Sequence, residues 1–280
     1  AMFAIGLALI WAAIKKQYEP MLLLPIGFGA ILANIPGSSA VGEHGVLTYL
    51  MKNGIENELF PVLIFVAVGA MIDFGPLLSR PFMLCYGFAA QIGIVITMVA
   101  ARMLGFDLGA ATAIGNIGAA DGPMAIVVSA RLAPQLLGPI SVAAYSYMAL
   151  VPIIQPPVIM AITTKKERMI RMPYHPKDVT ALTRVLFPIF VTLIAGTVAP
   201  ASAELIGFLM FGNLIRECGV LERLSKTAQN ELANLVTILL GISIGSTMVA
   251  ENFLRWDTAL IMLLGLFAFV FDTAGGVLFA

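Results

Sequence analysis

The sequence is poor in charged residues, histidine and cysteine. Only 11% of its 280 residues are charged, whereas a soluble domain carries about 25%. The formal net charge is zero, which gives no support for nucleic-acid binding. The two histidines, His44 and His175, lie in polar stretches, and Cys85 and Cys218 have neither metal-binding nor redox spacing. Phosphate-binding loops and nucleophile elbows are also missing. These absences argue against a soluble enzyme.

Apolar residues are abundant instead, at 60% of the chain. The stretch Pro81–Ala101 contains no charged residue at all. A helix that spans a bilayer needs about 20 predominantly apolar residues, and the sequence holds several such windows. The composition therefore predicts an all-α, polytopic membrane protein.

Ten apolar segments and one long polar loop can be distinguished. The loop, Gly37–Glu58, is expected to contain one amphipathic turn. The chain begins inside one apolar run and ends inside another, so we expect it to be incomplete at both ends. The predicted segments are Met2–Ile14, Met21–Ile35, Leu59–Ile72, Phe82–Leu104, Leu108–Arg131, Leu136–Ile162, Val185–Ala199, Leu205–Ile215, Leu235–Ala250 and Ala259–Ala280.

The distribution of lysine and arginine predicts the topology. The linker Thr163–Arg184 is basic and is therefore expected on the cytoplasmic side, because short cytoplasmic loops are rich in these residues. The acidic loop Gly37–Glu58 then falls outside only if Leu108–Arg131 enters and leaves the membrane on one side. The topology thus predicts a re-entrant hairpin over residues 108–131. The basic residues of the linker are Lys165, Lys166, Arg168, Arg171, Lys177 and Arg184.

The chain repeats parts of its own sequence. Ile26-Gly27-Phe28 with Asn34 resembles Ile206-Gly207-Phe208 with Asn213, and Gly69-Ala70-Met71-Ile72 resembles Gly245-Ser246-Thr247-Met248. On the predicted topology the copies run in opposite directions, which is typical of secondary transporters. Similar composition of membrane helices could also explain the match.

The repeat predicts a division of the chain. Residues 1–162, with the hairpin 108–131, would form the first inverted repeat. Residues 163–184 would be the cytoplasmic linker, and residues 185–280 an incomplete second repeat. By the same offset, the counterpart of Asp121 would lie at about position 297, beyond this chain.

The segment Gly115–Pro123 is the strongest candidate for a functional site. Gly122 and Pro123 break a helix, and broken backbone at membrane depth is tolerated where it lines a cavity or is buried in protein. An acid at that depth is costly and indicates function. Asp121, Asn116 and the carbonyl of Gly118 supply the oxygen ligands of a predicted Na⁺ site. Alternatively, Asp121 caps the helix that begins near Pro123.

Other polar residues in apolar segments are weaker candidates. Tyr145 and Tyr147 fall on different helix faces, so one could face lipid and the other a cavity; a position at the membrane interface is the alternative for each. Gln155 could link helices through hydrogen bonds, and the intramembrane Asp272 has no acidic counterpart near residues 92–96. The hydroxyls of Thr237, Ser243, Ser246 and Thr247 are expected to bond to backbone, and Asp73, Arg80, Glu251 and Arg255 to lie at helix ends.

Several stretches together resemble one known family, from about Lys15 to the last residue. They are Leu24–Gly29, Gly69–Phe74, Gly118–Pro123, Ala143–Pro152, Ile154–Pro157, Thr163–Arg168 and Phe211–Leu214. The chain is similar to the beta subunits of the sodium-pumping, biotin-dependent decarboxylases, which act on oxaloacetate, glutaconyl-CoA, methylmalonyl-CoA or malonate. Two positions depart from the usual motif, because Ala119 replaces a glycine and Met124 a threonine, which puts any role of that hydroxyl in doubt.

The resemblance implies an activity and its partners. A cytoplasmic carboxyltransferase and a biotin-carrying subunit would deliver carboxybiotin to this chain in a prokaryotic cell (inner) membrane. A small gamma- or delta-type membrane subunit and further copies of the chain would complete the complex. The chain would then decarboxylate carboxybiotin and export Na⁺ while a proton is consumed. Asp121 would handle Na⁺ and protons, and Tyr147 would donate a proton. A Na⁺-coupled or Na⁺/H⁺ transporter with no enzymatic role is the alternative.

Overall fold

The computed structural model describes residues 1–170 and 179–279. Among these residues every regular element is helical, which confirms the all-α prediction. The chain forms two compact units that interleave along the sequence: unit 1 contains residues 1–57, 85–171 and 238–280, and unit 2 contains residues 58–84 and 172–237. These units do not follow the predicted repeat boundaries at 162 and 185, and that division stays a prediction.

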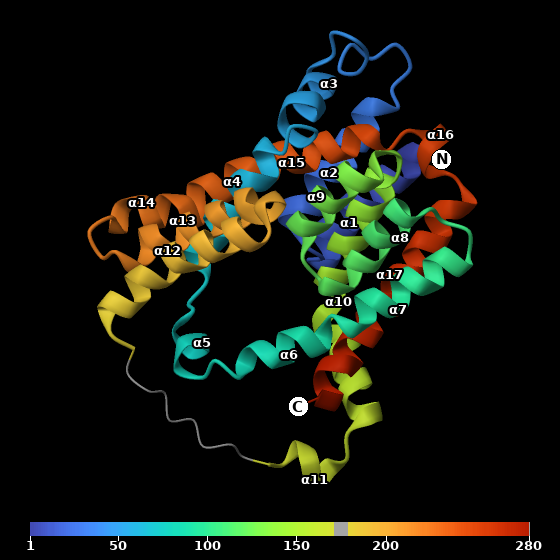
Figure 1. The fold of residues 1–280 in the computed structure, drawn as a ribbon. Coiled ribbons are helices and arrows are strands. Elements are labelled where there is room, and N and C mark those ends of the chain that lie inside the picture. Colours follow the sequence, from blue (N-terminus) through green and yellow to red (C-terminus); the bar gives the residue numbers. More distant parts are fainter. Residues whose placement is uncertain (171–178, 280) are drawn as a thin grey trace. The chain divides into compact units, whose positions relative to one another are not determined.

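Unit 1 contains most of the helices (Figure 1). Its α-helices are α1 (Met2–Lys16), α2 (Pro20–Ala33), α3 (Val46–Leu50), α7 (Ile92–Met103), α8 (Leu108–Gly115), α9 (Gly122–Leu132), α10 (Leu137–Ile162), α11 (Lys165–Arg168), α16 (Ala250–Phe253) and α17 (Trp256–Phe279). It also contains the π-helix η1 (Met51–Ile55), the 3-10 helices η2 (Asn116–Ala119) and η3 (Pro134–Leu136), and most of α6 (Met83–Ala90).

Unit 2 is smaller. Its helices are α4 (Leu59–Met71), α5 (Gly75–Ser79), α12 (Ala181–Val198), η4 (Pro200–Ser202), α13 (Ala203–Glu217), α14 (Glu222–Thr227) and η5 (Ala228–Leu232). Helix α15 (Ala233–Thr247) begins in unit 2 and continues into unit 1 at Ile238.

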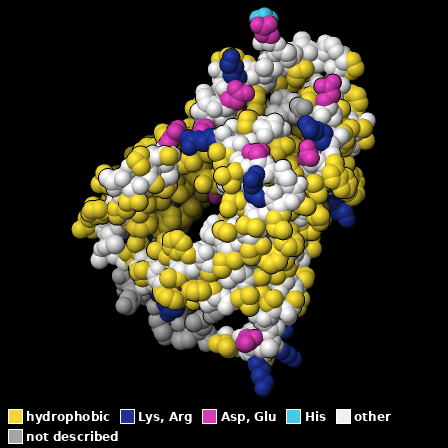
Figure 2. All heavy atoms as spheres, turned by 45° about the vertical axis from the view of Figure 1, so that its right-hand side comes forward, with side chains coloured by type: hydrophobic (Ala, Val, Ile, Leu, Met, Phe, Trp, Pro, Cys, Tyr) yellow, Lys and Arg dark blue, Asp and Glu magenta, His cyan; other side chains and the backbone are white. Residues whose placement is uncertain are grey.

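Three helical segments of the described chain are long and apolar enough to cross a membrane. They are Met83–Met103, Ala181–Val198 and Trp256–Phe279, and the number rises to five if each of two bent helix pairs is one span. Hydrophobic side chains cover much of the face drawn in Figure 2. A surface of this kind suits contact with lipid.

Two local predictions need correction. Residues Val46–Ile55 of the expected polar loop form α3 and η1, with Gly54 and Ile55 buried. The span predicted at Phe82–Leu104 has the expected length but is interrupted at Gln91, between α6 and α7. Neither glycine nor proline occupies position 91, so the usual sequence signal of a helix break is missing there.

The predicted broken hairpin is present in unit 1. Asp107 accepts hydrogen bonds from the backbone N–H groups of Gly109 and Ala110 and thereby starts α8. The chain turns after η2, and α9 returns alongside α8. A side chain on Gly109 would overlap the carbonyl of Leu132, so the start of α8 lies beside the end of α9. Both ends of the hairpin therefore lie together, as a re-entrant segment requires.

Small residues enclose this hairpin. The cluster around it is rich in fully buried alanines, including Ala101, Ala113 and Ala143, with Ile114 and Ile261. Helices α7, α10 and α17 contribute the surrounding side chains. Because membrane helices associate through close packing of small residues, the alanines allow α8 and α9 to lie close to all three.

In unit 1, α2 contacts the second part of α15 through two glycines. A side chain on Gly29 would overlap the carbonyl of Ile242 at 2.5 Å, and one on Gly245 would meet the backbone N of Ala30 at 2.8 Å. Asn34, at the end of α2, donates hydrogen bonds to the carbonyls of Ala30 and Met248, each at 2.8 Å. The contact thus joins helices that are more than 200 residues apart in sequence.

Unit 2 contains the same packing arrangement, built from the other copies of the repeated sequences. Side chains on Gly69 and Gly212 would overlap the carbonyls of Leu209 and Val66, respectively, so α4 and α13 touch through their backbones. The Asn213 amide donates to the carbonyls of Gly69 at 3.3 Å and Ile72 at 3.0 Å. The repeated sequences therefore form one kind of helix contact twice, and each contact joins one helix from each copy.

In one element, packing and sequence pair different residues of the two arrangements. Gly212 takes the place in unit 2 that Gly29 takes in unit 1, because each lies against the same point on its partner helix. The sequence match, continued from Ile26-Gly27-Phe28, instead pairs Gly29 with Leu209. The position of Gly245 relative to Gly69 agrees with the sequence match.

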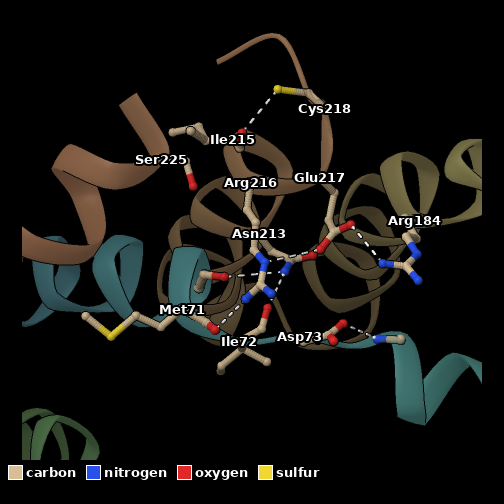
Figure 3. A network of polar contacts seen from close by, with 12 residues as sticks. Met71, Ile72, Asp73, Arg184, Asn213, Ile215, Arg216, Glu217, Cys218 and Ser225 are labelled. Carbon is tan, nitrogen blue, oxygen red and sulfur yellow. Dashed lines mark hydrogen bonds and ion pairs between the residues drawn. The ribbon is translucent and has the colours of Figure 1, made fainter. Parts of the chain in front are cut away.

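Polar side chains gather at one end of the contact between α4 and α13 in unit 2 (Figure 3). Arg216 donates to the carbonyl of Met71, beside the bond from Asn213 to Ile72. Glu217 lies 3.5 Å from Arg216 and 3.8 Å from Arg184. Asp73 accepts a hydrogen bond from the Gly75 N–H at 2.8 Å. Asn213, Arg216 and Asp73 thus provide hydrogen-bond partners for backbone groups at the end of α4 and the start of α5.

We predict that Gly69→Ala lowers stability, because the new methyl group would force α4 and α13 apart. Overpacking of this kind typically costs about 1–3 kcal/mol. The measurement is the midpoint of thermal unfolding in detergent. Gly87→Ala is the matched control, since nothing lies within 4 Å of its added Cβ and alanine is the better helix former. Equal losses in both variants would contradict the proposed contact.

Candidate functional site

The hairpin tip is built by a short break between two helices. Ala120 adopts a left-handed conformation, with φ of 52°, and its N–H bonds to the carbonyl of Ile117 at 3.2 Å. Asp121 follows in an extended conformation, and α9 begins at Gly122 with Pro123 in its first turn. Proline is well accommodated there, because the first helical N–H groups have no partner within the helix. The local sequence therefore determines where η2 ends and where α9 begins.

Asp121 is exposed at this tip and caps α9. Its Oδ1 accepts a hydrogen bond from the Met124 N–H at 3.1 Å. The capping interpretation of this residue is therefore correct for one oxygen of the carboxylate. Capping and ion binding do not exclude one another, because a carboxylate has two oxygens and several acceptor positions.

Tyr145 is the tyrosine that lies directly beside the tip. A side chain on Gly122 would overlap its phenol ring, so the ring packs against the backbone next to Asp121. The side chain is 1% exposed, and its hydroxyl has no hydrogen-bond partner among the described residues.

Tyr147 has different neighbours. Its hydroxyl donates a hydrogen bond to the carbonyl of Met262 in α17, and its ring lies against Gly265. At 9% exposed it is slightly more accessible than Tyr145. The two tyrosines of α10 thus face different parts of unit 1.

The remaining predicted Na⁺ ligands lie in η2. Asn116 is half-buried at its start, and Gly118 is buried two residues later. A side chain on Gly118 would overlap Oδ2 of Asp272 in α17, which places the backbone of Gly118 against that carboxylate. The sequence groups Gly118 with Asp121, and the contact with Asp272 has no local signal because the two residues lie far apart in the chain.

Two cavities lie at opposite ends of the hairpin. One, of about 310 Å³, adjoins the tip and is lined by Gln91, Gly118, Gln155, Asp272 and Thr273, among others. The other, of about 380 Å³, adjoins the open end near Asp107 and Gln135. Gln155, a weak candidate in the sequence, therefore lines the cavity at the tip.

The other polar candidates have structural roles. Ser243, Ser246 and Thr247 donate to the carbonyls of Leu239, Ser243 and Ile244, which confirms the expected backbone bonding. Arg255 pairs with Asp257 at 3.4 Å near the start of α17.

The basic linker is described only in part, because residues 171–178, including Arg171, His175 and Lys177, lie outside the described chain. Thr164 and Glu167 cap α11 reciprocally. Hydrogen bonds from the backbone and hydroxyl of Thr164 lower the pKa of Glu167. Lys165, Lys166 and Arg168 are exposed beside this cap.

We predict that Asp121→Ala destabilises the protein by about 1 kcal/mol, the usual cost of losing an N-cap. Asp121→Asn should leave stability nearly unchanged, because asparagine caps a helix as well as aspartate does. Thermal unfolding in detergent measures both. If the Asn variant loses as much as the Ala variant, capping does not explain the contribution of this residue to stability.

Comparison with known proteins adds independent information. All 280 residues match the family described as the Na⁺-transporting oxaloacetate decarboxylase beta subunit. The chain is 52% identical to the methylmalonyl-CoA decarboxylase subunit beta of Veillonella parvula, covering 99% of this chain and 74% of that protein. It is 51% identical to the glutaconyl-CoA decarboxylase subunit beta of Acidaminococcus fermentans, with the same coverage. It is 43% identical to oxaloacetate decarboxylase beta chain 2 of Salmonella typhi, covering 100% of this chain and 78% of that protein.

Proposed function

Because this chain belongs to the family of Na⁺-transporting oxaloacetate decarboxylase beta subunits, we propose that it decarboxylates carboxybiotin delivered by a partner subunit and exports Na⁺. Decarboxylation coupled to Na⁺ transport is the activity of its family. We further propose that a partner subunit delivers carboxybiotin and that the reaction consumes a proton. The observation that carries it is Asp121 at the tip of a broken hairpin, within a chain of this family.

The proposed reaction consumes one proton. The bond between the ureido nitrogen of biotin and the carboxylate carbon breaks, CO₂ leaves, and the nitrogen takes the proton. The protein must therefore supply a proton on the same cycle in which it releases Na⁺. A carboxylate that binds either cation can connect the two events.

Asp121 is the proposed carboxylate. When ionised it would hold Na⁺, with further oxygens from Asn116 and the backbone carbonyl of Gly118. When protonated it would release the ion. Its place at the break supports this role, since discontinuous helices supply ion ligands in membrane transporters. The cap to Met124 leaves its second oxygen for the ion.

Tyr147 is the proposed proton donor. Its hydroxyl is held by the carbonyl of Met262, so its position is fixed relative to α17. Tyr145 lies nearer to the tip, but its almost complete burial leaves little access for proton exchange. Greater exposure therefore favours Tyr147.

The partners follow from the proposed chemistry. A cytoplasmic carboxyltransferase and a biotin-carrier subunit would supply carboxybiotin, and a small gamma- or delta-type membrane subunit would join the complex. Several copies of this chain would assemble in the prokaryotic cell (inner) membrane. The exposed Lys165, Lys166 and Arg168 support a cytoplasmic position for this end of α10.

A Na⁺-coupled or Na⁺/H⁺ transporter without enzymatic activity is the weaker alternative. Re-entrant hairpins and intramembrane acids would suit it equally well. The similar proteins named above are decarboxylase subunits, which favours the coupled enzyme. Purification of the native protein together with a biotinylated subunit would distinguish the two.

We predict that Asp121→Asn abolishes Na⁺-dependent decarboxylation in the purified complex while its thermal stability stays near that of the wild type. The substitution keeps the cap and removes the charge that would hold the ion. Asp107→Asn is the matched control, because Asp107 caps α8 of the same hairpin. Na⁺-stimulated turnover that persists in Asp121→Asn would refute the proposed role.

We predict that Tyr147→Phe lowers the rate of decarboxylation by about 100-fold or more, the usual contribution of a general acid. Tyr145→Phe should have a much smaller effect, since its hydroxyl has no partner among the described residues. Turnover at saturating carboxybiotin is the measurement. A larger loss in Tyr145→Phe would assign the proton to the other tyrosine.

A further inference from the structure

Helices α12 and α13 of unit 2 form an apolar groove. Its volume is about 260 Å³, and its lining includes Ile189 and Leu193 of α12 with Met210, Phe211 and Leu214 of α13. Ile189, Leu193 and Phe211 are exposed although they are large and apolar. Because α12 is long and apolar enough to cross a membrane, its exposed face is expected to meet lipid.

The groove offers its occupant apolar contacts. The hydroxyl of Thr192, in the lining, already donates to the carbonyl of Pro188 at 2.8 Å. At one end the two helices touch, because a Cβ on Gly207 would lie 3.6 Å from the Thr192 methyl group and one on Gly196 would lie 3.7 Å from Ala203. A helix is about 10–12 Å across with its side chains, so it cannot enter a crevice between touching helices. An alkyl chain can.

Charged side chains lie beyond the other end of the groove (Figure 3). Arg184, about one turn before the groove on α12, is 3.8 Å from Glu217 of α13, and its side chain is 41% exposed. A Cβ on Gly75 would lie 3.6 Å from Nη2 of Arg184 and 3.0 Å from Oδ1 of the exposed Asp73. Arg216 lies 3.5 Å from Glu217. The groove therefore leads to a guanidinium group with two carboxylates near it.

These charges lie where the headgroup of a lipid would be expected. The basic linker leads into α12, so this end of the helix is expected at the cytoplasmic surface. Basic pockets between membrane helices on that side bind lipid headgroups, and a guanidinium group binds phosphate through two parallel hydrogen bonds. An anionic headgroup without an amine would place its negative charge beside Glu217 and Asp73. A zwitterionic headgroup with a primary ammonium group matches both signs, because the ammonium can donate hydrogen bonds to carboxylates.

We propose that this groove binds one acyl chain of a phosphatidylethanolamine molecule from the cytoplasmic leaflet. Its phosphate would lie at Arg184, and its ammonium group at Glu217 and Asp73. The acyl chain would fill the space between α12 and α13 and thereby stabilise their contact. The proposal goes beyond the proposed function and depends neither on the ion nor on the reaction.

The test is native mass spectrometry of the intact purified decarboxylase complex. The complex is stripped of lipid with detergent and mixed with phosphatidylethanolamine, phosphatidylglycerol or phosphatidylcholine that carry the same acyl chains. The wild type should bind one phosphatidylethanolamine per copy of this chain and bind the other two lipids less tightly. Gly207→Leu should abolish this binding, because its side chain would extend from the wall of the groove into it. Gly87→Leu is the matched control, since nothing lies within 4 Å of its added Cβ and it does not line the groove.

A second variant tests the headgroup. Arg184→Gln should weaken phosphatidylethanolamine binding by about tenfold or more, the usual loss when a hydrogen bond to a charged group is removed. Arg223→Gln is its control, because this exposed arginine of α14 lies beside Glu222 and Lys226 instead. If Gly207→Leu fails to fold, Arg184→Gln decides by the same measurement.

Three results would overturn the proposal. The first is equal binding of the three lipids, or binding that is unchanged in Gly207→Leu and Arg184→Gln. The second is a preference for phosphatidylglycerol, which would contradict the place given to the ammonium group. The third is a Gly207→Leu complex that loses copies of the chain but keeps its lipid, which would assign the groove to an interface between proteins. Loss of the Na⁺ response would refute the proposed function and leave the lipid measurement unaffected.

Discussion

Close approach between helix backbones at glycine is the contact on which both units depend. Lipid chains are as apolar as leucine, so hydrophobic side chains alone give membrane helices little reason to associate. Gly29 and Gly245 bring α2 against α15, and Gly69 and Gly212 bring α4 against α13. In each case an asparagine bonds to a carbonyl at the end of the facing helix. Backbone contact and amide hydrogen bonding therefore act together in both places.

The same kind of contact positions the candidate site. Gly122 lets the Tyr145 ring lie against the tip, and Gly118 lets the tip lie against Asp272. The tip thus has an acid of its own and a second acid from α17 beside it. A side chain at either glycine would move the tip away from one of these neighbours. The tip can be both broken and well positioned because the glycine backbone at positions 118 and 122 lies directly against its neighbours.

Features encoded by adjacent residues could be predicted from the sequence. The break at Ala120-Asp121, the proline in the first turn of α9 and the return of the hairpin follow from local glycine and proline chemistry. The hydroxyls of Ser243, Ser246 and Thr247 bond to backbone as expected, because this pattern needs only one helix. The glycine pairs of the repeat depend on packing, since Gly29 and Gly212 occupy equivalent places although the neighbouring sequence does not match them, whereas Asn34 and Asn213 match in sequence and in their hydrogen bonds.

Features that depend on distant residues could not be predicted. Position 91 itself has no glycine or proline to mark the interruption, and the N–H of Ile94 that follows it bonds to Asp272, which lies far along the chain. Residues 92–96 contain no acidic counterpart of Asp272. The structure shows that this region contains the group to which Asp272 bonds. The neighbours of Tyr145 and Tyr147 come from α9 and α17, so the periodicity of α10 alone could not assign them.

The interleaving of the two units has a consequence for biogenesis. Helix α4 leaves the ribosome long before α13, and α2 long before the part of α15 that it contacts. Asp272, which contacts the hairpin tip, is likewise synthesised about 150 residues after Gly118. Early helices must therefore remain inserted without their final partners during most of translation. Completion of the contacts around the hairpin tip is consequently a late event in the synthesis of the chain.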